Sequence, residues 1–323
     1  MASFLLVGDP HVVPEEMADC RRLADCIVDA IEKHKPENLV FLGDQHHNHS
    51  LVHVDVLAYW HETFARIQAL PSPPRVFALV GNHDMSSDKS STNHAMRSYE
   101  RQILVVSSPI EISGVLLMPY CHSPDVFKKA VAAFKCKTVI CHQTLDGSRY
   151  ENGFYSQDGV DITDFSDRYF ISGHIHTPQK FGNVVYVGAP RWRSVSDADI
   201  ERGLTLWDID GEPKLKLIQD TSAYCEKLVH LIDNQDAPLA HEMNPQWRYI
   251  VDIYGDELFV ASRKAVWKGA RIRTFVKTKG QQPVVRESMG ISQAIKAYTS
   301  GFLAPFGTPT ATLEKMVAER VSV

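Results

Sequence analysis

Short apolar segments alternate with amphipathic segments through the first two-thirds of the chain. Residues 17–31 carry apolar side chains at helical spacing, and residues 51–70 show the same period before the proline cluster that begins at Pro71. The other apolar segments are short, rich in β-branched or aromatic residues and bounded by turn residues. They predict strands at residues 4–7, 38–42, 75–80, 115–118, 138–141, 169–172 and 184–187. This alternation predicts an α/β domain built on a central sheet.

The pattern changes after about residue 220. Arg248–Ile253 and Arg271–Thr278 predict strands beside a helix near Glu257–Trp267, which together would form a small α+β unit. Two weaker helical patterns follow, at Ile291–Tyr298 and Thr312–Val321. We therefore expect three parts, at residues 1–218, 219–286 and 287–323.

Composition and charge narrow the class of protein only slightly. The chain has 323 residues, 44% of them hydrophobic, which is enough for a large domain and a smaller one. A formal charge of −5 gives no overall sign of a nucleic-acid binder, so such a surface would have to be a local patch. The six cysteines form no CxxC pair, and no apolar run approaches the roughly 20 residues of a membrane helix. We expect a cytoplasmic protein with reduced thiols and no membrane partner.

Side chains that can bind metals follow five of the predicted strands, at the point where each strand ends. In chain order they are Asp9 and His11, then Asp44, then Asn82-His83-Asp84, then His142, then His174 and His176. Because the carboxyl ends of parallel strands meet at one edge of an open α/β sheet, we expect these side chains to converge. Carboxylate and amide oxygens combined with imidazole nitrogens suit manganese, iron or zinc, and the lack of cysteine among them argues against a structural zinc.

The candidate ligands are too many for one ion. We assign them to a binuclear centre: Asp9, His11 and His176 for one ion, Asn82, His142 and His174 for the other, and Asp44 as the bridge. In such centres the ions lie about 3.5–4 Å apart, and a bound hydroxide attacks phosphorus because metal binding lowers the pKa of water from about 16 to about 7. Manganese, iron and zinc are the candidate ions from this donor set, with magnesium as a further one.

His83 and Asp84 are the expected catalytic residues beside this centre. An imidazole oriented by a carboxylate can stabilise the transition state and protonate the leaving group. A single D-x-H or a G-D after a strand is common in ordinary turns, and GNHD and GHIH are more specific. All of them in this order favour the catalytic interpretation.

Together these motifs resemble the calcineurin-like metallophosphoesterase superfamily over about residues 1–210. The resemblance implies an α/β sandwich of two sheets flanked by helices and a two-metal, usually manganese-supported phosphoester hydrolase. The phosphoprotein phosphatase branch carries a GDxxDRG motif, from which residues 43–48 (GDQHHN) depart.

The details look more like SbcD, the nuclease subunit of double-strand-break repair complexes, from phage or bacteria. His47 lies three residues past the bridging aspartate, His142 is followed by Gln, and GHIH continues as Thr-Pro-Gln at residues 177–179. The resemblance thereby adds His47 to the catalytic residues, although it could equally be a solvated loop residue. Gln45-His46 and Ala189 depart from the family pattern.

The same resemblance implies roles for the rest of the chain. Residues 219–286 would be a capping domain that places DNA over the metals, and residues 262–286 contain eight basic residues and no acidic one. A solvated strand face is the alternative. The expected DNA contacts are Arg191, Arg193, Arg263, Lys264, Lys268, Arg271, Arg273, Lys277 and Lys279.

Two partners besides DNA are expected. Residues 287–323 resemble the C-terminal helices that hold an SbcC-type coiled-coil ATPase, with docking onto the capping domain as the alternative. Residues 51–70 and 93–103 occupy the places through which family members form homodimers.

The sequence therefore predicts a two-metal DNA phosphodiesterase of SbcD type. It would act as an endonuclease and 3′→5′ exonuclease with its ATPase in DNA break repair, recombination or replication, in the host cytoplasm if phage-encoded. One alternative is a metallophosphoesterase for a small nucleotide or cyclic nucleotide, which would need neither the basic run nor the tail. The other is a catalytically inactive scaffold.

Overall fold

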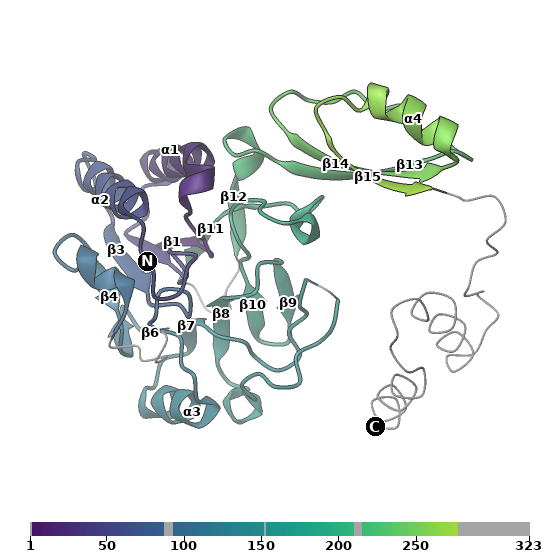
Figure 1. The fold of residues 1–323 in the computed structure, drawn as a ribbon. Helices are drawn as coiled ribbons and strands as arrows, with labels where there is room; N and C mark the ends of the chain where they lie inside the picture. The colour runs from purple at the N-terminus through teal and green to yellow at the C-terminus, as the bar shows by residue number, and fades with distance from the viewer. Residues whose placement is uncertain (1, 87–92, 152, 210–214, 277–323) are drawn as a thin grey trace, which may run out of the picture. The chain divides into compact units, whose positions relative to one another are not determined.

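The computed structural model describes residues 2–86, 93–151, 153–209 and 215–276 (Figure 1). The described part of the chain divides into two compact units, one of residues up to 230 and 242–250, the other of residues 231–241 and 251–276. The first unit runs past residue 218, because the strand Lys216–Asp220 pairs with Gly203–Asp208 in the first sheet.

The first sheet has six strands. In spatial order they are β12 (Lys216–Asp220), β11 (Gly203–Asp208), β1 (Ser3–Val7), β2 (Asn38–Phe41), β3 (Arg75–Leu79) and β4 (Leu104–Val106). β1 to β4 are parallel, and β11 and β12 are antiparallel additions. The carboxyl ends of β1, β2 and β3 therefore lie at the same edge.

The second sheet also has six strands. Their order is β5 (Ile110–Ile112), β6 (Val115–Met118), β7 (Thr138–His142), β8 (Tyr169–Gly173), β10 (Val184–Tyr186) and β9 (Gln179–Phe181). The four central strands are parallel, and the edge strands β5 and β9 are antiparallel.

The two sheets pack face to face and helices cover their outer faces (Figure 1). Alternate residues of one strand serve the two sides: Phe4 and Leu6 lie in the core between the sheets, whereas Leu5 and Val7 pack against α1 (Met17–His34) and α2 (Val54–Gln68). On the second sheet, Val139 and Cys141 pack with α3 (Pro124–Ala133). Burial on both faces explains the continuous apolar runs, since each buried Leu or Phe contributes roughly 1.5–3 kcal/mol.

The expected fold class, a two-sheet α/β sandwich flanked by helices, is confirmed. The sequence pattern alone predicted one central sheet, and the structure has two of equal size. Short 3-10 helices complete this part of the chain: Pro14–Glu16, Ala95–Tyr99, Thr163–Phe165, Val195–Asp197 and Thr221–Ala223.

A third sheet follows, with three strands in the order β13 (Leu228–Asn234), β14 (Arg248–Gly255) and β15 (Arg271–Val276). Helix α4 (Glu257–Val266) begins at Asp256, whose side chain accepts a hydrogen bond from the Phe259 backbone N–H. The buried carboxylate of Asp233 accepts hydrogen bonds from Arg263 and from the Trp267 indole, which fastens α4 to β13.

The tail helices expected at 291–298 and 312–321 lie outside the described residues, as do Lys277 and Lys279. In the part of the chain that the structure describes, every helix is too short or too polar to cross a lipid bilayer.

Candidate metal centre

The polar strand ends meet at one place in the structure. Asp9 and His11 follow β1, Asp44 follows β2, and Asn82 and His83 follow β3. From the second sheet, His142 ends β7, and His174 and His176 follow β8. The two sheets are joined here directly, because His142 Nδ1 donates a hydrogen bond to the carbonyl oxygen of Leu42 over 2.7 Å.

One group of donor atoms lies around His11. His11 Nε2 is 2.9 Å from His176 Nε2 and 3.6 Å from Asp44 Oδ2. Asp9, His11 and Asp44 also form a cluster whose ligand atoms lie within 4.8 Å of one another.

A second group lies around His142. Asn82 Oδ1 is 3.0 Å from His142 Nε2 and 2.8 Å from His174 Nδ1, and these two ring nitrogens are 3.3 Å apart. Asp44 Oδ2 is 3.3 Å from His142 Nε2. The same carboxylate oxygen therefore faces both groups.

These separations suit metal ligands. Two donors, each about 2.1 Å from an ion and at tetrahedral or octahedral angles, lie about 3.0–3.4 Å apart. The atoms named above are 2.8–3.6 Å apart, and several of them can only accept. Because His142 Nδ1–H donates to Leu42, the Nε2 lone pair of the neutral ring would face the Asn82 carbonyl oxygen, an arrangement that a cation between the two atoms stabilises.

Asp9 offers a further observation of the same kind. Its Oδ1 accepts the backbone N–H of His174 over 2.7 Å, while its Oδ2 is buried without a hydrogen-bond partner among the described residues. An unsatisfied buried carboxylate oxygen costs about 1–3 kcal/mol or more. The donor set therefore fits divalent cations.

The backbone at the centre is held in uncommon conformations. His11, Asp44 and His174 have φ of 44°, 54° and 81°, in the left-handed region that residues other than glycine rarely adopt. Such strain persists only where surrounding structure imposes it, and it gathers at functional sites. A Cβ on Gly43, whose φ is 111°, would lie 2.3 Å from His142 Nδ1, so only glycine allows this close approach.

The electrostatics of the centre keep His11 and His174 neutral and favour positive charge at His142. Burial lowers the pKa of His11 well below its ordinary value, and burial together with His142 lowers the pKa of His174 to about 3. At His142 burial also disfavours the charged form, but the carboxylates of Asp44 and Asp9 outweigh it and raise the pKa to about 9. The two carboxylates thus favour a cation at this point.

His83 lies against the centre but is oriented differently from the sequence expectation. Its backbone N–H donates to Asp44 Oδ1 over 2.8 Å, and its ring Nδ1 donates to the carbonyl oxygen of His47. The buried Asp84 carboxylate instead accepts from His46, through the backbone N–H and ring Nδ1, both at 2.9 Å. The expectation that Asp84 orients His83 is therefore corrected: Asp84 holds the His46 segment in place.

His47 lies between His11 and Arg193. Its Nδ1 accepts from Arg193 Nη1 over 3.0 Å and is 3.4 Å from His11 Nδ1. Burial and the Arg193 guanidinium lower the pKa of His47 to about 4, so this ring is neutral at pH 7.

A family model matches this chain. The model describes calcineurin-like phosphoesterases and covers residues 2–178, which contain every candidate metal ligand. The chain belongs to this family. Membership makes the protein a metal-dependent hydrolase of phosphoester bonds, in agreement with the His/Asp cluster at the strand ends.

Two solved structures resemble this calcineurin-like phosphoesterase at a distance. Yfce, a phosphoesterase from E. coli, is 12% identical, with 69% of this chain and 94% of that chain covered and a TM-score of 0.36. GAP50, the anchor in the inner membrane complex of Plasmodium, is 10% identical, with 87% and 99% covered and a TM-score of 0.44. Among curated proteins none matches the chain.

The expected DNA contacts of the phosphoesterase divide into three sets. Arg191 is buried and bonded to Glu16 and Asp19, which does not suit a surface contact. Arg263 and Arg273 form ion pairs with Asp233 and Asp252. The exposed ones are Lys264, Lys268 and Arg271, and Arg193 is partly exposed.

Sequence reasoning missed several residues of the phosphoesterase site. Glu151 Oε1 accepts the backbone N–H of His176 over 3.1 Å, and the ring of His49 stacks on that of His83 with 4.2 Å between centroids. The ring of Tyr120 lies 5.7 Å from that of His174. No motif marks these positions, since each follows from loop geometry alone.

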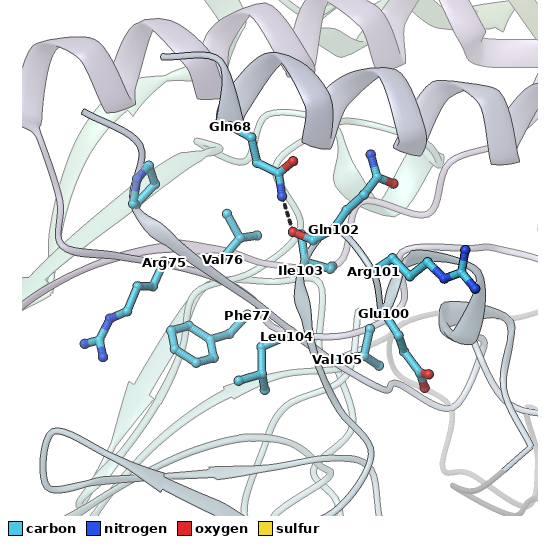
Figure 2. Close-up of a pocket in the computed structure, with 11 residues that line it drawn as sticks. Gln68, Arg75, Val76, Phe77, Glu100, Arg101, Gln102, Ile103, Leu104 and Val105 are labelled. Atoms are coloured by element: carbon cyan, nitrogen blue, oxygen red, sulfur yellow. Dashed lines mark hydrogen bonds between the residues drawn. The ribbon is translucent and has the colours of Figure 1, made fainter. Parts of the chain in front are cut away.

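A pocket of about 660 Å³ lies elsewhere on the first unit (Figure 2). It is lined by the first residues of β3 and β4, by Gln68 of α2 and by residues 100–103. The metal centre is at the carboxyl ends of the strands, and this pocket is at their amino ends, so it is not part of the phosphoesterase site.

Proposed function

We propose that the protein is a two-metal DNA phosphodiesterase of SbcD type. The observation that carries the two-metal part is the position of Asp44 Oδ2, 3.6 Å from His11 Nε2 and 3.3 Å from His142 Nε2. One carboxylate oxygen that faces two separate groups of imidazoles suits a bridge between two ions. When bound, the ions would polarise the phosphate and supply a nucleophile from water at neutral pH.

His83 is the proposed proton donor to the leaving oxygen. Because its Nδ1–H is held by the His47 carbonyl, its Nε2 is the atom that can exchange a proton with substrate. The hydrogen bond from its backbone N–H to Asp44 Oδ1 ties its position to the bridging carboxylate. His47 is neutral at pH 7 and adjoins the partly exposed Arg193, whose cationic guanidinium suits a phosphate oxygen.

DNA as the substrate is supported by charge outside the metal centre. Lys264 on α4, Lys268 in the turn that follows and Arg271 on β15 are exposed, in a stretch without acidic residues. Such residues contact phosphates with a strong dependence on salt. The SbcD-like continuation of the ligand motifs, Gln143 after His142 and Thr-Pro-Gln after His176, also supports a nuclease. Endonuclease and 3′→5′ exonuclease action in DNA repair, recombination or replication, with manganese as the metal, belongs to the same proposal.

Partners are part of the proposal as well. Residues 287–323, outside the described residues, would hold the SbcC-type ATPase. For the homodimer, the two expected segments adjoin one another: Tyr99 packs on Phe64 of α2 with 5.4 Å between ring centroids, and Gln68 donates to the Gln102 carbonyl oxygen (Figure 2). Two exposed apolar residues lie here, Leu51 in the segment before α2 and Val54 at its first position.

One experiment separates the proposal from a small-molecule hydrolase. The purified protein is incubated with manganese and, separately, a labelled duplex, a hairpin DNA and bis-p-nitrophenyl phosphate. Cleavage of both DNA substrates that disappears in Asp44→Ala, and is retained in the exposed control Asp208→Ala, would support the nuclease. Turnover of the small ester without DNA cleavage would contradict it.

A further inference from the structure

Two arginines are buried in the loop segment between β10 and β11. Arg191 and Arg202 are each 1% exposed. Removing a guanidinium from water is costly, and a buried arginine is tolerated only where acidic partners and hydrogen bonds compensate for the lost hydration. The hydrogen bonds of each arginine reach the backbone of a candidate metal ligand.

Arg202 contacts the segment that carries His176. Its Nη1 donates to the carbonyl oxygens of His176 and Ala189, both at 2.8 Å, and its Nη2 donates to Asp197 Oδ1 at 2.7 Å. The Ala189 backbone N–H donates to the same His176 carbonyl at 3.0 Å. His176 lies beyond the end of β8, where strand pairing no longer holds the backbone. The hydrogen bonds to its carbonyl oxygen therefore fix the backbone at this residue.

Arg191 contacts the segment that carries His11. Its Nη2 donates to the carbonyl oxygens of Pro10 and His11 at 3.0 and 3.3 Å, and its Nη1 is held by Glu16 and Asp19. This segment also lies beyond its strand, and His11 has the left-handed φ of 44°. The guanidinium fixes the carbonyl on one side of the strained residue.

The two arginines are linked through Asp197. Its Oδ1 accepts from Arg202, and its Oδ2 accepts the backbone N–H groups of Arg193 and Ser194 at 2.8 and 2.7 Å. Arg193 in turn donates to Glu16 Oε2, which also receives Arg191. One network therefore connects the backbones of His11 and His176, whose Nε2 atoms are 2.9 Å apart.

We propose that Arg191 and Arg202 are positioning residues for one of the two metal subsites, that of Asp9, His11 and His176. The inference rests on the proposed two-metal site. In the described residues, neither guanidinium has a hydrogen bond to Asn82, His142 or His174, so the other subsite is built without them. Substitution of either arginine should therefore weaken the binding of the ion at this subsite and leave the binding of the other ion unchanged.

The test is Mn²⁺ binding by calorimetry and by electron paramagnetic resonance, which reports spin-coupled ion pairs. For Arg202→Met and Arg191→Met we expect one Mn²⁺ per chain at wild-type affinity and the other weakened at least 10-fold, within the 10–100-fold range typical of groups that orient ligands. The coupled-pair signal should disappear at a manganese concentration that saturates the wild type.

Two further variants keep the test decisive. Arg202→Lys retains the charge but cannot span both carbonyls and Asp197, so it should lose the same ion even if Arg202→Met fails to fold. Arg168→Met removes a guanidinium that donates to the Val131 carbonyl at 2.6 Å, away from the ligands, and should bind both ions normally. Two ions at wild-type affinity in the Arg202 variants, or equal weakening of both ions, would overturn the inference. Failure of the wild type to bind a pair would instead refute the proposed function.

Discussion

At the residue scale, the candidate metal ligands could be predicted from the sequence, but the residues that contact each ligand could not. Asp9, His11, Asp44, Asn82, His142, His174 and His176 each follow a strand, so the pattern indicated them, and the structure brings them together. Some of their supports come from loops distant in sequence: Glu151 accepts the His176 backbone N–H, and Arg202 donates to the His176 carbonyl oxygen. Spacing carries no information about such contacts.

His83 and Asp84 make a matched pair of predictions. For His83→Asn we expect the turnover number to fall by about 10²–10⁴-fold, the usual contribution of a proton donor, with Mn²⁺ binding retained.

For Asp84→Asn we expect loss of about 2–4 kcal/mol in the free energy of unfolding, because an amide cannot accept all the hydrogen bonds that the carboxylate accepts from His46 and Gly81. Urea titrations and kinetics measure both. Unchanged stability with lost turnover in Asp84→Asn would restore the pair suggested by sequence.

Gly43 offers a test of close packing at the centre, with Gly114 as the control. Both have positive φ, 111° and 79°, so alanine at either position is strained by about 1–2 kcal/mol. Only at Gly43 would the new Cβ collide, 2.3 Å from His142 Nδ1, whereas open space surrounds Gly114. We expect Gly43→Ala to lose Mn²⁺ binding measured by calorimetry and Gly114→Ala to keep it. Normal binding in Gly43→Ala would show that the ligand loop adjusts freely.

At the element scale, the strands that form an unbroken apolar run were predicted closely, whereas most strands that mix apolar and polar residues were missed, including the largely buried β11. β6 is predicted at its observed bounds, because Val115–Met118 is apolar throughout and buried. The edge strands β5 and β9 have half-exposed residues, and β12 includes Lys216 and Asp220. None of these strands contains an apolar run that would predict it. Pairing in a sheet, rather than composition, makes these segments strands.

The fastening of α4 predicts acid sensitivity in the second unit. Burial disfavours ionised Asp233, but bonds from Trp267, Arg263 and the Leu239 backbone outweigh burial and lower its pKa below 3.8. A carboxylate with a depressed folded pKa stabilises the protein fully above the unfolded pKa, and this stability is lost as pH falls through the folded value. Hydrogen-exchange protection of β13 to β15 should therefore fall below about pH 4. In Asp233→Asn this acid-dependent step should be absent, and an identical acid profile would contradict the assignment.

At the scale of the whole molecule, fold and family could be predicted and the substrate remains a proposal. The strand-end motifs carried the family resemblance, and the family match over residues 2–178 agrees with it. The number of sheets did not follow from periodicity, because a strand buried on both faces looks the same in one central sheet or in two stacked sheets. The substrate did not follow from the motifs, because the metal-ligand residues define phosphoester chemistry and not the group that carries the phosphate.

Two exposed lysines, Lys264 on α4 and Lys268 in the turn after it, give a test of DNA as substrate. The net charge of −5 makes a nonspecific attraction weak, so a local patch should dominate the salt dependence. For the double variant Lys264→Gln and Lys268→Gln we expect weaker duplex binding and a slope of log K against log salt reduced by about 0.9 per lost phosphate contact. Lys137→Gln, on the first unit, serves as control. An unchanged slope in the double variant would remove α4 from the DNA-binding surface.

The most direct test of the central claim is anomalous diffraction from crystals soaked in Mn²⁺. The account predicts two peaks about 3.5–4 Å apart on either side of Asp44 Oδ2, one against His11 and His176 and the other against Asn82, His142 and His174. A single peak, or two peaks that do not share Asp44, would contradict it.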